Sequence, residues 1–177
     1  MLSVRHYSSP LGGVLIAADE IGLTGLWFKG QKYFPDSFAE PTQEKETPVL
    51  RSAVLWLDGY FRGECPDFTP PLHPSGTPFR RAVWDILLQI PYGETVTYGD
   101  IARRLAAERR LPGMSAQAVG GAVGHNPISL IIPCHRVVGA DGSLTGYAGG
   151  LEKKAYLLAL EQGTLPSGAS RITKEKA

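Results

Sequence analysis

The stretch Ser115-Ala116-Gln117-Ala118-Val119-Gly120-Gly121-Ala122-Val123-Gly124 decides the prediction of the fold. Serine is a preferred N-cap, so we expect a helix that begins after Ser115 and ends near His125. Each glycine inside a helix costs about 1 kcal/mol relative to alanine. Such a cost indicates that something approaches the helix backbone very closely. That neighbour is either another helix of this chain or the backbone of a nucleic acid.

A second helix is expected just before this one, capped by Thr97 and running from Tyr98 to Ala106. A polar loop, Ala107–Gly113, joins the two, and two helices connected in this way suggest a helix-turn-helix. Gln117 is the long polar side chain at the start of the glycine-rich helix, so we expect it to reach into a duplex. The minor groove is about 6 Å wide, and such a narrow groove requires small neighbours.

The charges divide unevenly along the chain. Residues 1–77 hold 6 Lys+Arg and 9 Asp+Glu, whereas residues 78–177 hold 12 Lys+Arg and 8 Asp+Glu. A basic second half fits a polyanionic partner near that half. It equally fits an ordinary solvated surface, so the charge alone does not decide between the two.

The most informative chemical motif is Ile132-Pro133-Cys134-His135-Arg136-Val137. A cysteine among apolar residues is commonly a buried and inert thiol. Three neighbours favour a reactive one instead. His135 can act as a base, Arg136 brings a positive charge that favours a thiolate, and Asn126 offers an amide to the same region.

The spacing of these residues restricts the mechanism. In extended backbone, successive side chains point to opposite faces, so His135 would reach Cys134 through a bridging water. A histidine base also needs an acceptor that orients its other ring nitrogen. Glu161 lies on an apolar stripe of the last predicted helix and could be that acceptor. A salt bridge from Glu161 to Arg136 or Lys154 is an equal alternative.

The prolines of the segment Cys65–Pro78 indicate a linker between two domains. We therefore expect a first domain at residues 1–77, a second at 78–165 and a disordered tail at 166–177. The fold class is α/β, of the α+β kind. The expected elements are strands at Val4–Tyr7, Val14–Ala18, Leu23–Phe28, Leu130–Ile132 and Arg136–Val138, and further helices at Pro48–Phe61, Phe79–Gln89 and Leu151–Gln162.

Composition excludes several classes of protein. The chain has two cysteines, Cys65 and Cys134, so a disulfide framework is not expected and the cytoplasm is the predicted location. No Cys/His cluster has the spacing of a zinc site, and neither a metal nor another cofactor is expected. No apolar run is long enough for a membrane span, and the N-terminus does not resemble a secretory signal.

Together these motifs resemble the O6-alkylguanine-DNA alkyltransferases, also called methylated-DNA–protein-cysteine methyltransferases. The resemblance is close over about residues 78–162 and loose before them. It is carried by Ile90-Pro91-Tyr92-Gly93-Glu94-Thr95, Tyr98-Gly99, Ala118-Val119-Gly120-Gly121-Ala122, Asn126-Pro127, Ile132-Pro133-Cys134-His135-Arg136-Val137-Val138 and Gly146-Tyr147-Ala148-Gly149-Gly150. It implies a ribonuclease-H-like first domain and a winged helix-turn-helix second domain.

The resemblance also implies a reaction and its residues. Cys134 would accept an alkyl group from O6 of guanine, and also from O4 of thymine, irreversibly and in a single turnover. His135 would be the base through a water, with Glu161 orienting it. Asn126 would position the thiol, and Tyr98 would press on the backbone phosphate and protonate the leaving guanine.

The partner implied by the resemblance is double-stranded DNA that contains O6-alkylguanine. A monomer would bind it through the minor groove while the damaged base flips into the protein. The implied base pocket contains Tyr147, Ala148 and Val137. The implied DNA-binding residues are Tyr98, Gly99, Ala116, Gln117, Ala118, Gly120 and Gly121.

Two features depart from the family pattern. Many members carry arginine where this chain has Gln117, which can fill space but brings no charge. The loop Ala107–Gly113 is longer than in some relatives, and its Arg109 and Arg110 could contact phosphates instead. The zinc ligands of the human-type first domain also have no counterpart here. Two other functions are possible for such a sequence, a cysteine hydrolase and a non-catalytic sensor of alkylated bases, although such sensors replace the acceptor cysteine.

Overall fold

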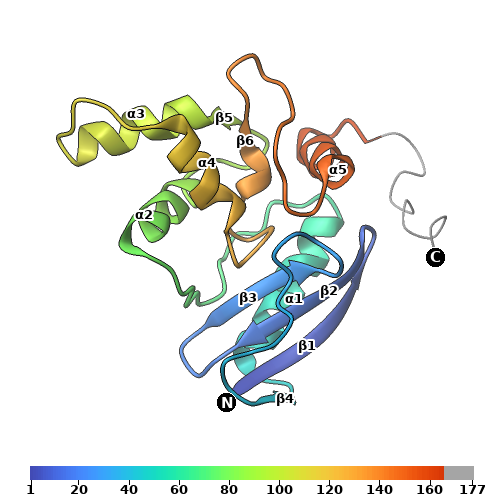
Figure 1. Cartoon of the computed structure of the whole chain (residues 1–177). Helices are drawn as coiled ribbons and strands as arrows, with labels where there is room; N and C mark the ends of the chain where they lie inside the picture. Colours follow the sequence, from blue (N-terminus) through green and yellow to red (C-terminus); the bar gives the residue numbers. More distant parts are fainter. Residues whose placement is uncertain (166–177) are drawn as a thin grey trace.

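The computed structural model describes residues 1–165 of the chain, so the tail expected at 166–177 lies outside the described residues. The elements are β1 (Leu2–Ser9), β2 (Gly12–Ala18), β3 (Leu23–Phe28), β4 (Thr42–Glu44), α1 (Pro48–Phe61), α2 (Pro78–Leu87), β5 (Val96–Thr97), α3 (Tyr98–Glu108), α4 (Ala116–Gly124), the 3-10 helix η1 (Cys134–Arg136), β6 (Val137–Val138) and α5 (Leu151–Gln162). In Figure 1 the sheet and α1 lie below α2, α3 and α4.

The first half forms a four-stranded sheet in the order β3-β2-β1-β4. The strands β1, β2 and β3 pair antiparallel with one another and were expected from the sequence. The short strand β4, which pairs in parallel with β1, was not expected. All three residues of β4 are exposed, so it lacks the apolar alternation by which strands are recognised. Helix α1 packs against β1 and β2. It is capped by Thr47 and has Pro48 in its first turn, where a missing N–H costs nothing.

The edge strand β3 joins the two halves of the chain. Leu23 exchanges backbone hydrogen bonds with the linker, accepting from His73 N at 2.7 Å and donating to Pro71 O at 2.8 Å. Leu26 does the same with the segment after α4, donating to Pro127 O and accepting from Ser129 N, both at 2.9 Å. The edge is therefore covered, and one continuous core extends across both halves.

The second half is built on α2, α3 and α4, which contact one another. The indole of Trp84 on α2 donates to the carbonyl of Ala122 on α4 at 2.9 Å. The predicted caps are confirmed, since Thr97 forms a capping box with Asp100 and Ser115 accepts from Ala118 N at 3.2 Å. Helix α3 continues two residues beyond its predicted end, to Glu108.

The strands predicted around Cys134 are partly wrong. Only Val137–Val138 is a strand, paired in parallel with β5, while Leu130–Ile132 forms turns. Leu130 has a φ of 72°, which reverses the chain, and Arg136 N donates to Pro133 O at 3.0 Å to close the 3-10 turn. Short apolar runs are buried in strands and turns alike, so their hydrophobicity does not distinguish the two.

Candidate active site

The cysteine at the centre of the motif is buried. Cys134 begins the 3-10 helix η1, and 5% of its surface is exposed. Asn126 braces the turn before it by donating to Ile132 O at 2.8 Å and accepting from Ile128 N at 2.9 Å. Burial raises the pKa of the Cys134 thiol, whereas a hydrogen bond from Asn126 and the positive charge of Lys154 oppose this rise.

The next residue, His135, is fully buried and oriented by a carboxylate. Its Nε2 lies 2.5 Å from Glu161 Oε2, so Nε2 carries the proton and Nδ1 is the basic nitrogen. Nδ1 has no hydrogen-bond partner among the described protein groups. Burial lowers the pKa of His135 despite the opposing effect of Glu161, so the ring is neutral at pH 7. The site thus holds an oriented neutral base next to a thiol.

Glu161 accepts hydrogen bonds from several parts of the chain. Arg136 Nε donates at 2.7 Å and Gly93 N at 3.0 Å to Oε1, and Tyr60 OH donates at 2.6 Å to Oε2. Both alternatives from the sequence therefore hold for this residue, because it orients His135 and also pairs with Arg136. Burial alone would raise the pKa of Glu161, but His135 and Arg136 together lower it to about 2.

Lys154 does not pair with Glu161. Its buried ammonium donates to the carbonyls of Val137 at 2.5 Å, Thr145 at 2.8 Å and Gly146 at 3.3 Å. Burial lowers the pKa of Lys154 to about 8. This one side chain therefore ties α5 to β6 and to the loop that precedes α5.

That loop forms one wall of a cleft of about 340 Å³. Gly146, Tyr147 and Ala148 come from the loop, and the opposite wall is the glycine-rich helix α4. Tyr98 also lines the cleft and donates from its hydroxyl to Thr145 O at 3.0 Å. Burial raises the pKa of both Tyr98 and Tyr147, and a negative charge on Cys134 adds to this rise in each ring.

The glycines of α4 do not serve packing within the described chain. A Cβ at Gly121 or Gly124 would meet no described atom within 4 Å, and one at Gly120 would meet Tyr98 at 3.8 Å. Within residues 1–165, therefore, no other helix requires these glycines, and that alternative is wrong for the described part of the chain. Helix α4 buries Val119, Ala122 and Val123 and leaves its glycine-containing face open to an outside partner.

The structure brings most of the predicted site residues together. Cys134, His135, Glu161 and Asn126 form one buried group, and Tyr98, Tyr147, Ala148, Gly120 and Gly121 line the cleft. Val137 is buried and does not line it, while Ala116, Gln117 and Ala118 are exposed at the start of α4. Gly99 is half-buried in the first turn of α3, and Arg109 and Arg110 are exposed after that helix.

Sequence reasoning missed Tyr60 and the backbone of Gly93 as partners of Glu161. It considered Lys154 only as an ion-pair partner. No periodicity or motif connects these positions, because Tyr60 lies on α1, 101 residues before the carboxylate it contacts. Only the fold brings them together.

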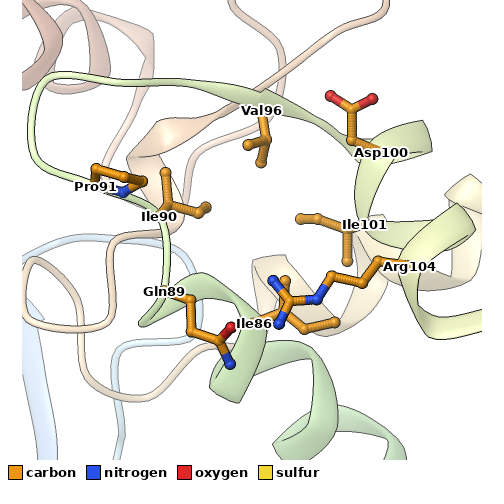
Figure 2. Close-up of a pocket in the computed structure, with 8 residues that line it drawn as sticks. All are labelled: Ile86, Gln89, Ile90, Pro91, Val96, Asp100, Ile101 and Arg104. Carbon is orange, nitrogen blue, oxygen red and sulfur yellow. Dashed lines mark hydrogen bonds between the residues drawn. The ribbon is translucent and has the colours of Figure 1, made fainter. Parts of the chain in front are cut away.

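A second cavity of about 130 Å³ lies between α2 and α3. Figure 2 shows Ile86, Ile90, Val96 and Ile101 around it, with Arg104 at its edge. Arg104 is hydrogen-bonded to Gln89 and Glu108, so its charge is already satisfied. The cavity has no nucleophile in its lining and is separate from Cys134.

In residues 1–165, no three His, Cys, Asp or Glu side chains are grouped so that they could hold a metal ion. None of the helices described there combines the length and apolarity needed to cross a membrane.

Family models match most of the chain. The ribonuclease-like domain of 6-O-methylguanine DNA methyltransferase matches residues 3–74, and the DNA binding domain of the same family matches residues 78–163. These matches confirm the predicted fold class.

Individual relatives agree with the family models. The chain is 44% identical to the methylated-DNA–protein-cysteine methyltransferase of Haemophilus influenzae, over 91% of this chain and 87% of the relative. It is 46% identical to the enzyme of the same name from Methanosarcina acetivorans, over 88% and 95%. A solved structure of Mycobacterium tuberculosis OGT in complex with DNA superposes with a TM-score of 0.79 and 40% identity, over 96% and 99% of the two chains. The chain therefore belongs to the 6-O-methylguanine DNA methyltransferase family, as a methylated-DNA–protein-cysteine methyltransferase.

Proposed function

We propose that this chain repairs DNA directly, by moving an alkyl group from O6 of guanine onto Sγ of Cys134. A sulfur–carbon bond forms as the bond between the alkyl carbon and O6 breaks. His135 Nδ1 accepts the thiol proton through a water, and Tyr98 supplies a proton to the departing guanine. His135 then returns the proton to Tyr98 through water, so the net result is that one proton moves from the thiol to guanine. O4-alkylthymine would react in the same way.

The observation that carries this proposal is the buried group Cys134–His135–Glu161. The 2.5 Å contact between His135 Nε2 and Glu161 leaves Nδ1 as the basic nitrogen. Because burial holds His135 neutral, it can accept a proton at pH 7. The carboxylate then stabilises the imidazolium that forms.

The cleft beside this group supports the assignment of a base pocket. Tyr147 and Ala148 form its loop wall, and Val137 holds that wall from beneath because its carbonyl accepts from Lys154. Asn126 positions the thiol through its hydrogen bonds on both sides of the turn. Tyr98 must exchange its bond to Thr145 O for one to the substrate before it can donate a proton.

We further propose that the chain, as a monomer, binds the minor groove of DNA through α4. The open glycine face of α4 supports this, since a narrow groove admits a helix whose outward residues are small. The proposed contacts are Tyr98, Gly99, Ala116, Gln117, Ala118, Gly120 and Gly121. The two family models, which end at 74 and begin at 78, support a domain division within the proline-rich linker.

The direct test is the mass of the intact protein after mixing with duplex DNA that contains O6-methylguanine. We expect one added methyl group per chain, located on Cys134, and no further turnover with excess DNA. A thioether offers no easy leaving group, so nothing regenerates the thiol. Sustained turnover, or a methyl group on Cys65, would contradict the proposal.

Gln117 provides a test of base flipping. Extruding a base costs a few kcal/mol, and a side chain that fills the vacated space offsets part of this cost. Gln117 is exposed in the first turn of α4, between Ala116 and Ala118. We expect Gln117→Ala to slow repair of duplex DNA much more than transfer from free O6-benzylguanine, which needs no flipping.

The matched variant is Gln117→Arg, which should keep or improve duplex repair and make DNA binding more sensitive to salt. Both variants are compared on both substrates in one assay. Equal slowing of the free base and the duplex by Gln117→Ala would assign Gln117 to the pocket or the fold. No slowing of either would assign the opening of the duplex to Arg109 and Arg110.

A further inference from the structure

A turn of the N-terminal half also reaches the cleft. Lys32 and Tyr33, which follow β3, line it together with the residues of α4 and the loop before α5. Neither residue belongs to one of the sequence motifs described above. We call this pair the N-terminal clamp.

The turn that carries the clamp is held rigidly. Gln31 is buried, accepts from Phe28 N at 2.8 Å through its side chain and donates to Lys32 O at 3.1 Å. Beyond the clamp, Phe34 packs edge-on against Trp27 of β3, with ring centroids 6.4 Å apart. The clamp is therefore fixed to the sheet on both sides.

The clamp contacts both walls of the cleft. The backbone N–H of Lys32 donates to Ala148 O at 2.9 Å, which ties the sheet to the loop wall. The ring of Tyr33 stacks on His125 at the end of α4, with centroids 4.2 Å apart and an interplanar angle of 25°. Adjacent residues of one turn thus hold the two walls at a set separation.

The backbone of Tyr33 supports a functional reading of this contact. The φ angle of Tyr33 is 63°, in the left-handed region that residues with a Cβ rarely adopt. Such strain persists where the surrounding structure imposes it, and it gathers at functional sites. The ring is also half exposed, at 50%, so burial of the ring is not what holds it in this conformation.

We propose that the N-terminal clamp sets the width of the base cleft and that Tyr33 is a positioning residue for alkyl transfer. This rests on the proposed function, because the cleft must hold the flipped guanine. Tyr33 acts through His125 and α4 on the orientation of the bound base. It lies at the opposite end of α4 from Gln117, so its effect should fall on transfer and not on DNA affinity.

The test measures the transfer rate at saturating substrate, DNA affinity and thermal stability for a set of variants. We expect Tyr33→Ala to slow transfer from duplex DNA and from free O6-benzylguanine alike, by roughly threefold to tenfold, the range that corresponds to loss of one aromatic pair. DNA affinity should change less than about twofold. Tyr33→Phe keeps the stack and should restore the rate.

Two further variants separate positioning from folding. Tyr33→Gly relieves the strained φ, so its melting temperature should stay at or above that of Tyr33→Ala while transfer remains slow. Phe68→Ala removes an exposed aromatic ring of the linker and should transfer at the wild-type rate. The effects of Tyr33→Ala and His125→Ala on the rate should not add, because both remove the same contact.

Several outcomes would contradict the proposed role of the N-terminal clamp. Slowing on duplex DNA alone, with weakened binding, would make Tyr33 a DNA contact. A lower melting temperature with an unchanged rate would make it structural. A wild-type protein that transfers from neither substrate would contradict the proposed function and the clamp with it, whereas equal rates for Tyr33→Ala and an active wild type would contradict the clamp alone.

Discussion

Replacing Cys134 by serine is expected to abolish alkyl transfer while DNA affinity stays within about tenfold of wild type, or roughly 1.4 kcal/mol. The thiolate is the proposed nucleophile, and a serine hydroxyl is not activated to a comparable extent by a neutral histidine. The proposed groove contacts lie on α4 and in the first turn of α3, and they do not include the buried Cys134. Intact mass measures transfer, and fluorescence anisotropy with labelled duplex DNA measures binding.

The matched control is Cys65→Ser, which changes the other cysteine of the chain. Cys65 is exposed in the linker, and its removal should leave the transfer rate unchanged. A loss of DNA affinity much greater than tenfold in Cys134→Ser would show that the thiol also anchors DNA. The proposal that Cys134 serves only transfer, while other residues bind DNA, would then be wrong.

Replacing Glu161 by glutamine is expected to reduce both stability and transfer. The carboxylate is fully buried and compensates the charge of Arg136, which is itself 7% exposed. Removing one partner of a buried ion pair costs roughly 3–5 kcal/mol. Unfolding by urea measures the loss. The control Glu108→Gln removes an exposed carboxylate paired with Arg104 and should change stability by less than about 1 kcal/mol.

The same substitution should raise the apparent pKa of the thiol. Glu161 stabilises protonated His135, and without that negative charge the thiolate at Cys134 is less favoured. The rate of thiol alkylation against pH, measured on the folded variant, reports this pKa. An unchanged profile would assign Glu161 to the fold alone and exclude it from the chemistry.

The lowered pKa of Glu161 also predicts how the stability of the protein depends on pH. Its folded pKa of about 2 lies below the ordinary value of 4.5. A carboxyl group whose pKa is lower in the folded than in the unfolded protein stabilises the fold when it is ionised. For Glu161 this stabilisation is fully present above pH 4.5 and is lost as the pH falls toward about 2. Wild type should therefore lose stability over this window, and Glu161→Gln should lose less. Equal slopes for the two proteins would contradict the ion-pair assignment.

The local rules of the sequence predicted much of the second half. Thr97 and Ser115 are the N-caps of α3 and α4. A capping side chain bonds to backbone groups only two or three residues away, so the starts of both helices can be predicted without tertiary information. Interior glycines carry an intrinsic cost and therefore signal a close approach. The Pro-Cys-His-Arg motif indicated a candidate nucleophile and a candidate base because these residues are adjacent in the chain.

Backbone geometry near the cysteine did not follow from those rules. Leu130–Ile132 has the composition of a buried strand, yet the positive φ of Leu130 converts it into turns. Likewise, the sequence left open whether Glu161 orients His135 or pairs with Arg136. A carboxylate has two oxygens with several lone pairs, and in the structure it accepts from both.

By itself, then, the sequence determined the helices, the three long strands, the candidate nucleophile and the family, because helix caps, glycine costs and adjacent reactive groups act over a few residues. Only the tertiary structure decided which face of α4 is open and which distant groups complete the site. Tyr60 meets Glu161 across 101 residues, and Tyr33 meets His125 from the other half of the chain. Such contacts arise from how the sheet packs against the helices, and no local pattern encodes that packing.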